Sequence, residues 1–312
     1  MFCIQSLRVD YQNVTAVHDL SLELQAGTIY GLVGPNGAGK TSTIKAIAGI
    51  IEPTSGVITI DGFDTQTRRF EALKRLGYMP DFAPVYENLK VWEYLDVFGA
   101  AYQMPVSERK EKIDYWLARV DLKMKAEEFI RTLSRGMRQR LVLAKTLLSD
   151  PSLILLDEPA SGLDPISRMD LRNILKDVAS QGKTIIISSH VLTELSEFCN
   201  AIGVMEKGRL VVSGSMEEIR RKMGSANRLV IKGQDRGEAD KIVQFLQEKR
   251  LEVLPSGAGD NAEIAVIFDG NGQAAAQLLR EMVTAGILVS EFYPEQDTME
   301  DIFFKIGAKE AS

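Results

Sequence analysis

The chain has 312 residues, of which 45% are hydrophobic and 26% charged, so it has the composition of a globular protein with room for two domains. The net charge of −6 argues against nucleic acid as the main partner, because nucleic-acid-binding domains are usually basic. With two cysteines, no signal-peptide pattern and no long apolar run, we expect a reducing, cytoplasmic setting and no membrane-spanning segment.

The first strong pattern in chain order is a short apolar strand over 29–33, then a Gly-rich turn and a helix from about Lys40. Glycines let the backbone curl so that successive N–H groups point inward, and the helix N-terminus adds partial positive charge. Lys40 is suited to reach the β- and γ-phosphates, and the Thr41 hydroxyl to ligand Mg²⁺. The predicted phosphate-binding residues are Gly34, Pro35, Asn36, Gly37, Ala38, Gly39, Lys40, Thr41 and Ser42.

A second helix start, within TLSRGMRQRLVLAKTL, also has the features of an anion site. Ser134 is a good N-cap, and Gly136 permits close approach to the backbone. Since the Lys40 loop already holds one phosphate group, one resolution is that Ser134 and Gly136 contact the nucleotide bound by a second copy. Two subunits facing head to tail would then enclose two ATP molecules.

The segment PSLILLDEP predicts a buried strand that ends at Asp157 and Glu158. Ligands bind at the carboxyl ends of parallel strands, where Asp157 would hold Mg²⁺, usually through water, and Glu158 would orient or deprotonate the attacking water. An Asp-Glu pair alone could simply cap the next turn. Together with the loop at Lys40, it predicts a nucleoside triphosphatase.

His190 follows another apolar strand, at 184–187, and so lies on the same side of the predicted sheet. A lone histidine is more often structural, but this position is where a bound phosphate is expected. Tyr11 is open to two interpretations from the residues alone, a packed strand residue or an aromatic surface for a base.

The tail differs in charge from the rest of the chain: residues 225–312 hold 9 basic and 15 acidic side chains, whereas 1–224 hold 28 of each. With the joint GSAN at 224–227, this shift predicts two domains, 1–222 and 225–312. Strand patterns alternate with helix patterns in the tail, the last over DTMEDIFFKIG. We predict a small α+β domain, with a ferredoxin-like arrangement as one option.

Taken together, GPNGAGKTS, LSRGMRQ, LILLDEP, SGLDP and IIISSH resemble, in this order, the motifs of the ATP-binding subunits of ABC transporters, over residues 1 to about 222. The resemblance implies an α/β P-loop NTPase core with a helical insertion at about 85–150. It implies ATP and Mg²⁺ as ligands, Tyr11 stacked on adenine, His190 at the γ-phosphate, and the SGLDP loop at the opposite subunit. The accessory tail is similar to that of the drug-resistance-type and sodium-type exporter branch.

The sequence departs from the family pattern at two places. Arg135 replaces a glycine of the signature, where it could add a cation near the opposing phosphates or be solvated, and we favour solvation slightly. Asp81 replaces the glutamine of the family's glutamine loop, where it could ligand Mg²⁺ or merely cap the turn after Pro80. In the family, the groove beside this loop receives a helix from the membrane subunit, so we expect Tyr86 and Trp92 near that contact.

The resemblance therefore implies a motor subunit that dimerises with a second copy or a paralogous ATPase subunit. Its partners would be membrane-spanning subunits encoded elsewhere, it would be peripheral on the cytoplasmic side of the cell membrane, and export is the expected direction. The alternative is a soluble, non-transport ABC ATPase that acts on nucleic acid or ribosomes. A regulatory ATP-binding module with little turnover is a third option, against which the presence of both Glu158 and His190 argues.

Overall fold

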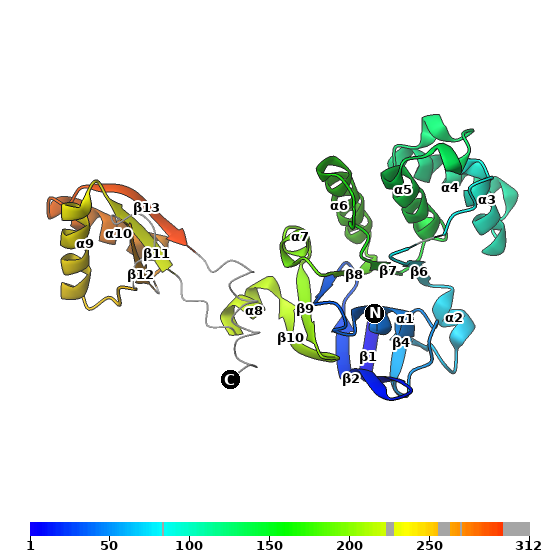
Figure 1. Cartoon of the computed structure of the whole chain (residues 1–312), viewed down its shortest axis with the longest axis horizontal. Coiled ribbons are helices and arrows are strands. Elements are labelled where there is room, and N and C mark those ends of the chain that lie inside the picture. The colour runs from blue at the N-terminus through cyan, green and yellow to red at the C-terminus, as the bar shows by residue number, and fades with distance from the viewer. Residues whose placement is uncertain (83, 223–227, 255–262, 269, 296–312) are drawn as a thin grey trace. The chain divides into compact units, whose positions relative to one another are not determined.

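A computed structural model gives the fold, and its described residues are 1–82, 84–222, 228–254, 263–268 and 270–295 (Figure 1). The chain forms two compact units, Met1–Met216 and Glu217–Ser312, and each is described by itself. The expected joint at 224–227 and the expected last helix over 297–307 lie outside the described residues. Across the described residues, no helix is both long enough and apolar enough to span a bilayer.

The first unit is built on a six-stranded sheet with the order β10-β9-β3-β8-β7-β6. All neighbouring pairs are parallel except β9 and β10. Every residue of the central strands β3, β7 and β8 is buried, as expected for a parallel sheet covered on both faces. The strands are β3 (Ile29–Val33), β6 (Leu76–Met79), β7 (Leu153–Asp157), β8 (Thr184–Ser189), β9 (Ala201–Glu206) and β10 (Arg209–Ser215).

A second, antiparallel sheet has the order β2-β1-β4-β5. Its strands β1 (Phe2–Tyr11), β2 (Val14–Leu24), β4 (Ser55–Ile60) and β5 (Phe63–Asp64) precede and follow β3 and α1 (Lys40–Ile47) in the chain. Inward residues of β1, β2 and β4 share one hydrophobic core with Ile44 and Ile47 of α1 and with residues of the parallel sheet. This packing buries α1 and so fixes the loop that precedes it.

The insertion between β6 and β7 is helical, as predicted (Figure 1). It contains α3 (Val91–Ala101), α4 (Val106–Arg119) and α5 (Arg135–Leu147), with single 3₁₀ turns at Lys123–Lys125 and Ile130–Thr132. The other helices of the first unit are α2 (Arg69–Leu73), α6 (Pro165–Ser180) and α7 (Leu192–Ser196). Helix α8 (Met216–Lys222) begins at the last residue of the first unit and continues into the second.

The second unit has β11 (Arg228–Gly233), α9 (Arg236–Glu248), β12 (Glu263–Ile267), α10 (Gly272–Thr284) and β13 (Val289–Glu295). Its sheet has the order β12-β11-β13, with both outer strands antiparallel to β11. Val253 forms a further antiparallel bridge to Val266 of β12. Apolar residues of α9 and α10 pack on this sheet, which confirms the small α+β domain; the ferredoxin-like arrangement stays a prediction.

Candidate nucleotide-binding site

A cleft of about 720 Å³ lies at the carboxyl ends of β3 and β7. That volume is in the range of pockets for small ligands, roughly 300–1,000 Å³. The cleft brings together residues that the sequence places up to 197 positions apart, from Tyr11 to Gly208. The predicted residues that line it are Tyr11, Asn36, Gly37, Ala38, Gly39, Lys40, Thr41, Ser42, Asp81, Glu158 and His190.

The loop between β3 and α1 requires glycine at two positions. Gly39 has a φ of +102°, and a Cβ atom there would lie 2.4 Å from the carbonyl oxygen of Ala16. At Gly34, a Cβ atom would lie 2.3 Å from the carbonyl oxygen of Met205. Both contacts are too short for any side chain, so the path of this loop depends on these glycines.

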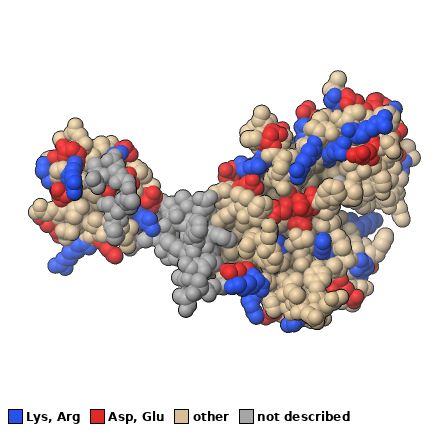
Figure 2. Space-filling model, in the orientation of Figure 1, with Lys and Arg blue, Asp and Glu red and all other residues tan. Residues whose placement is uncertain are grey.

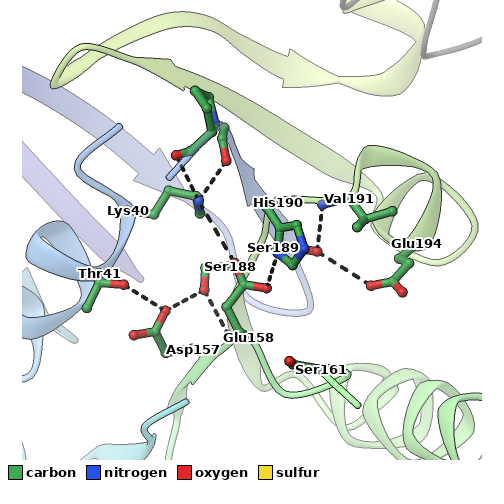
Figure 3. A network of polar contacts seen from close by, with 12 residues as sticks. Lys40, Thr41, Asp157, Glu158, Ser161, Ser188, Ser189, His190, Val191 and Glu194 are labelled. Carbon is green, nitrogen blue, oxygen red and sulfur yellow. Dashed lines mark hydrogen bonds and ion pairs between the residues drawn. The ribbon is translucent and has the colours of Figure 1, made fainter. Parts of the chain in front are cut away.

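Lys40 folds back over the loop from the first turn of α1 (Figure 3). Its Nζ donates hydrogen bonds to the carbonyl oxygens of Gly34, at 2.6 Å, and Pro35, at 3.2 Å. Glu158 Oε1 lies 3.9 Å from the same atom. Burial lowers the pKa of Lys40, and the charges of Glu158 and Asp157 act in the opposite direction. The ammonium group is thus held at the mouth of the loop, where it can meet an anion.

Asp157 is buried at the end of β7, and one hydroxyl joins it to Glu158 (Figure 3). Ser188 Oγ donates to Asp157 Oδ1 at 2.6 Å and accepts from the backbone N–H of Glu158 at 3.0 Å. Thr41 Oγ1 donates to the same Asp157 oxygen at 3.3 Å. Sequence reasoning missed Ser188. The available signal was its place in IIISSH, because the parallel register pairs Ser188 with Asp157.

Glu158 lines the cleft and also contacts Ser188, Lys40 and His190. Its Oε2 lies 2.9 Å from His190 Nδ1, and its other oxygen faces Lys40. Glu158 has a φ of +48°, a left-handed conformation that is uncommon for a residue other than glycine. Such backbone persists only where the surroundings enforce it, and the bond from its N–H to Ser188 is one such restraint. The carboxylate therefore has one cation and one imidazole as neighbours.

The oxygens of Thr41 and Asp157 suit a magnesium ion. Two adjacent ligands of an octahedral Mg²⁺ are about 3.0 Å apart, since each lies at about 2.1 Å from the metal. Thr41 Oγ1 and Asp157 Oδ1 are 3.3 Å apart, so Asp157 could hold an ion bound to Thr41 either directly or, as expected from the sequence, through water. Within the described parts of the chain, no group of three or more His, Cys, Asp or Glu side chains could hold a metal ion. The remaining ligands would thus be phosphate oxygens and waters, as is usual for Mg²⁺ in nucleotide sites.

Asp81 lines the cleft with Thr41 and Glu158. Among the described residues, it forms no group of three or more His, Cys, Asp or Glu side chains that could hold a metal ion. Burial raises the pKa of the neighbouring Tyr78 to about 12, and the charges of Asp157 and Asp81 add to the effect. A role for Asp81 as a metal ligand stays a prediction. Tyr11 is 44% exposed at the end of β1 and borders the cleft, so it is available for stacking and is not a packed strand residue.

Ser134 and Gly136 are not part of this cleft. Ser134 caps α5, and its Oγ accepts from the N–H of Met137 at 3.3 Å. Ser134 is exposed, so the start of α5 is accessible from outside the subunit. Arg135 is exposed too, but its guanidinium group lies against Gly162 and donates to the carbonyl oxygen of Ser161 at 3.5 Å. Its end therefore contacts the protein while the side chain stays exposed, so the solvated interpretation of Arg135 stays a prediction.

Comparison with known proteins shows which family has this site. The ABC transporter family matches residues 17–161, and the C-terminal domain of DrrA1-3-like ATP-binding proteins matches residues 214–306. The uncharacterized ABC transporter ATP-binding protein YcbN of Bacillus subtilis is 32% identical over 297 residues, which are 95% of this chain and 93% of that protein. The chain belongs to the ABC transporter ATP-binding proteins. The family predicted from the motifs and the tail is confirmed.

Other members of the family match a smaller share of this chain. An uncharacterized ABC transporter ATP-binding protein of Synechocystis is 37% identical over 75% of this chain, and the chain spans 65% of that relative's length. The Nod factor export ATP-binding protein I of Cupriavidus metallidurans is 35% identical over 69% of this chain and 71% of its own length.

Solved structures agree on the fold. The structure of an ATP-binding subunit of an ABC transporter superposes with a TM-score of 0.67, at 28% identity, over 72% of this chain and 93% of that one. A dimeric ATP-binding cassette bound to ADP and Pi gives a TM-score of 0.63 at 23% identity, over 69% of this chain and 99% of its own. The P-loop NTPase core of the ABC type, predicted from the motifs, is confirmed.

Proposed function

We propose that this chain is the ATP-hydrolysing motor of an ABC transporter. The observation that carries the proposal is the placement of Glu158 at the mouth of the phosphate loop, between Lys40 and His190. A carboxylate in that position can accept a proton from water that attacks the γ-phosphorus, while the bond to the leaving ADP oxygen breaks. His190 orients the carboxylate, and Lys40 balances charge on the phosphates.

Thr41 and Asp157 would hold the Mg²⁺ that accompanies ATP, with Asp81 as a further candidate ligand. The ion, when bound, would neutralise charge on the phosphate oxygens. Ser188 keeps the carboxylate of Asp157 in place through its 2.6 Å hydrogen bond. Tyr11 would stack on the adenine base, since its exposed ring borders the same cleft as the loop.

We infer that the complete site needs a second subunit, either another copy or a paralogous ATPase subunit. The exposed start of α5, with Ser134 and Gly136, is absent from the residues that line the cleft of its own subunit. A helix N-terminus favours bound anions. In a head-to-tail pair, this end would meet the γ-phosphate held by the partner, so that two ATP molecules would be enclosed.

The membrane-spanning partner is proposed to dock beside the glutamine-loop segment. A groove of about 690 Å³ runs along Pro80–Phe82 and Pro84–Val85 and against α5. Phe82 lines this groove and is 85% exposed, whereas Tyr86, at 60%, and Trp92, at 36%, are not among the lining residues. An amphipathic helix of a membrane subunit would cover this apolar edge. The chain would thereby be peripheral on the cytoplasmic side of the membrane, with export as the proposed direction.

No described feature favours the alternative, a soluble ATPase acting on nucleic acid or ribosomes. Acidic and basic side chains are interspersed over the visible face of the described residues (Figure 2), and the chain has a net charge of −6. A protein that neutralises phosphates along a nucleic acid usually carries a concentrated basic surface.

The test of the proposed ATPase is Glu158→Gln, with Glu248→Gln on α9 as the matched control. Hydrolysis should fall by about a hundredfold or more in Glu158→Gln, because the proton acceptor is lost. In the presence of ATP, the Glu158→Gln protein should then accumulate as a dimer, which size-exclusion chromatography can detect. Hydrolysis by Glu158→Gln at the wild-type rate would show that Glu158 is not the base.

Purification of the tagged chain from gently solubilised membranes tests the membrane-spanning partner. Recovery only with ribosomes or DNA would contradict the proposed transporter function.

A further inference from the structure

Two side chains on one face of α5 contact the loop that follows Glu158. Gln139 Nε2 donates to the carbonyl oxygen of Pro159 at 2.6 Å, and this bond is partly buried. Arg135, one helical turn earlier, donates to the carbonyl oxygen of Ser161 at 3.5 Å. Residues four apart lie on the same side of a helix, so both contacts arise from a single face. The loop is thus held at its first and third residues.

The fit between Arg135 and Gly162 is close. A Cβ atom on Gly162 would lie 2.7 Å from Arg135 Cζ and within 2.9–3.0 Å of its two terminal nitrogens. Gly162 has a φ of +70°, which by itself favours glycine at this position. The guanidinium group therefore occupies space beside Gly162 that a Cβ atom would need. Replacement of the family's usual signature glycine by Arg135 is matched by this space at Gly162.

The far end of the loop is fixed by α6. Asp164 caps that helix, and its Oδ1 accepts from the N–H of Ser167 at 3.0 Å. Within the loop, the N–H of Ser161 donates to the carbonyl oxygen of Glu158 at 3.1 Å. The turn that carries Glu158 is therefore restrained by α6 on one side and by α5 on the other.

We propose that Arg135 and Gln139 form a clamp that positions Glu158 for hydrolysis. The clamp joins the start of α5, with Ser134 at its tip, to the residues directly after Glu158 in the same subunit. Glu158 has a strained φ of +48°, and its backbone needs support from both neighbouring segments. Arg135 and Gln139 are positioning residues, because both act through the loop. The inference rests on the proposed ATPase function.

The clamp predicts a specific kinetic pattern. Gln139→Met keeps an unbranched side chain of similar length but removes the donor, and Arg135→Ala removes the guanidinium group. Each should lower kcat about five- to tenfold, because a lost hydrogen bond displaces Glu158 only in part. The KM for ATP should stay within about twofold, since Lys40 and its loop are untouched. The controls Gln277→Met on α10 and Arg131→Ala should retain wild-type kcat.

A double variant separates positioning from general destabilisation. If Gln139 acts through Glu158, then adding Gln139→Met to Glu158→Gln should not reduce the residual single-turnover rate further. Amide hydrogen exchange should also rise in residues 158–163 of Gln139→Met and Arg135→Ala, in the absence of nucleotide.

Three results would overturn the clamp: unchanged kcat in both single variants, a further loss in the double variant, or unchanged exchange in the 158–163 segment. A wild-type chain that does not hydrolyse ATP would instead contradict the proposed function itself. The exchange experiment requires no turnover, so it tests the clamp in either case.

Discussion

The buried hydroxyl of Ser188 offers a test of how the two acidic residues are held. Ser188→Ala removes the donor to Asp157 Oδ1, at 2.6 Å, and the acceptor for the Glu158 N–H, at 3.0 Å. A hydrogen bond to a charged group contributes about 1.5–3 kcal/mol, and an unsatisfied buried N–H costs about 1–3 kcal/mol. Since the two effects share one atom and are not additive, we expect a loss of about 3 kcal/mol in the free energy of unfolding.

Urea unfolding of Ser188→Ala and wild type measures this loss directly, with the m-value as a check on two-state behaviour. Ser180→Ala on α6 is the matched control, because that hydroxyl donates only to an exposed carbonyl oxygen, and its effect should stay within about 0.5 kcal/mol. In the same samples, kcat should fall by about tenfold, since Glu158 loses one restraint. A Ser188→Ala protein that is as stable and as active as wild type would refute this account of the site.

Two further predictions concern the loop and the helical insertion. Gly39→Ala should abolish detectable ATP binding in a fluorescent-nucleotide titration, because its Cβ would lie 2.4 Å from the Ala16 carbonyl oxygen; binding within twofold of wild type would contradict the geometry. Lys145 on α5 has its pKa lowered by burial from 10.5 to about 8, so the unfolded chain binds more protons than the folded one between these values. Raising the pH from 8 to 10 should therefore stabilise wild type relative to Lys145→Met by roughly 2 kcal/mol in parallel urea titrations, and a pH-independent difference would exclude this.

Local patterns in the sequence were enough to predict the phosphate loop and the ends of the neighbouring strands. A buried strand, a Gly-rich turn and a helix start are encoded by contiguous residues, so the loop at Lys40 could be recognised without the fold. The carboxyl ends of parallel strands meet at one edge of a sheet, so Asp157 and His190 could be expected near that loop. The α+β tail followed from strand and helix patterns in the same way, whereas the helical insertion was expected from the family resemblance.

Other parts of the site depend on contacts between distant residues, which no local pattern encodes. The register of β7 against β8 places Ser188 beside Asp157. The packing of α5 against the loop after Glu158 decides the orientation of Arg135, which the sequence left open. Exposure of Tyr11 is likewise a property of the assembled sheets. Sequence by itself therefore determined which residues are the candidates for the chemistry. Only the tertiary structure decided how they are held, because the restraints are hydrogen bonds and packing across separate elements.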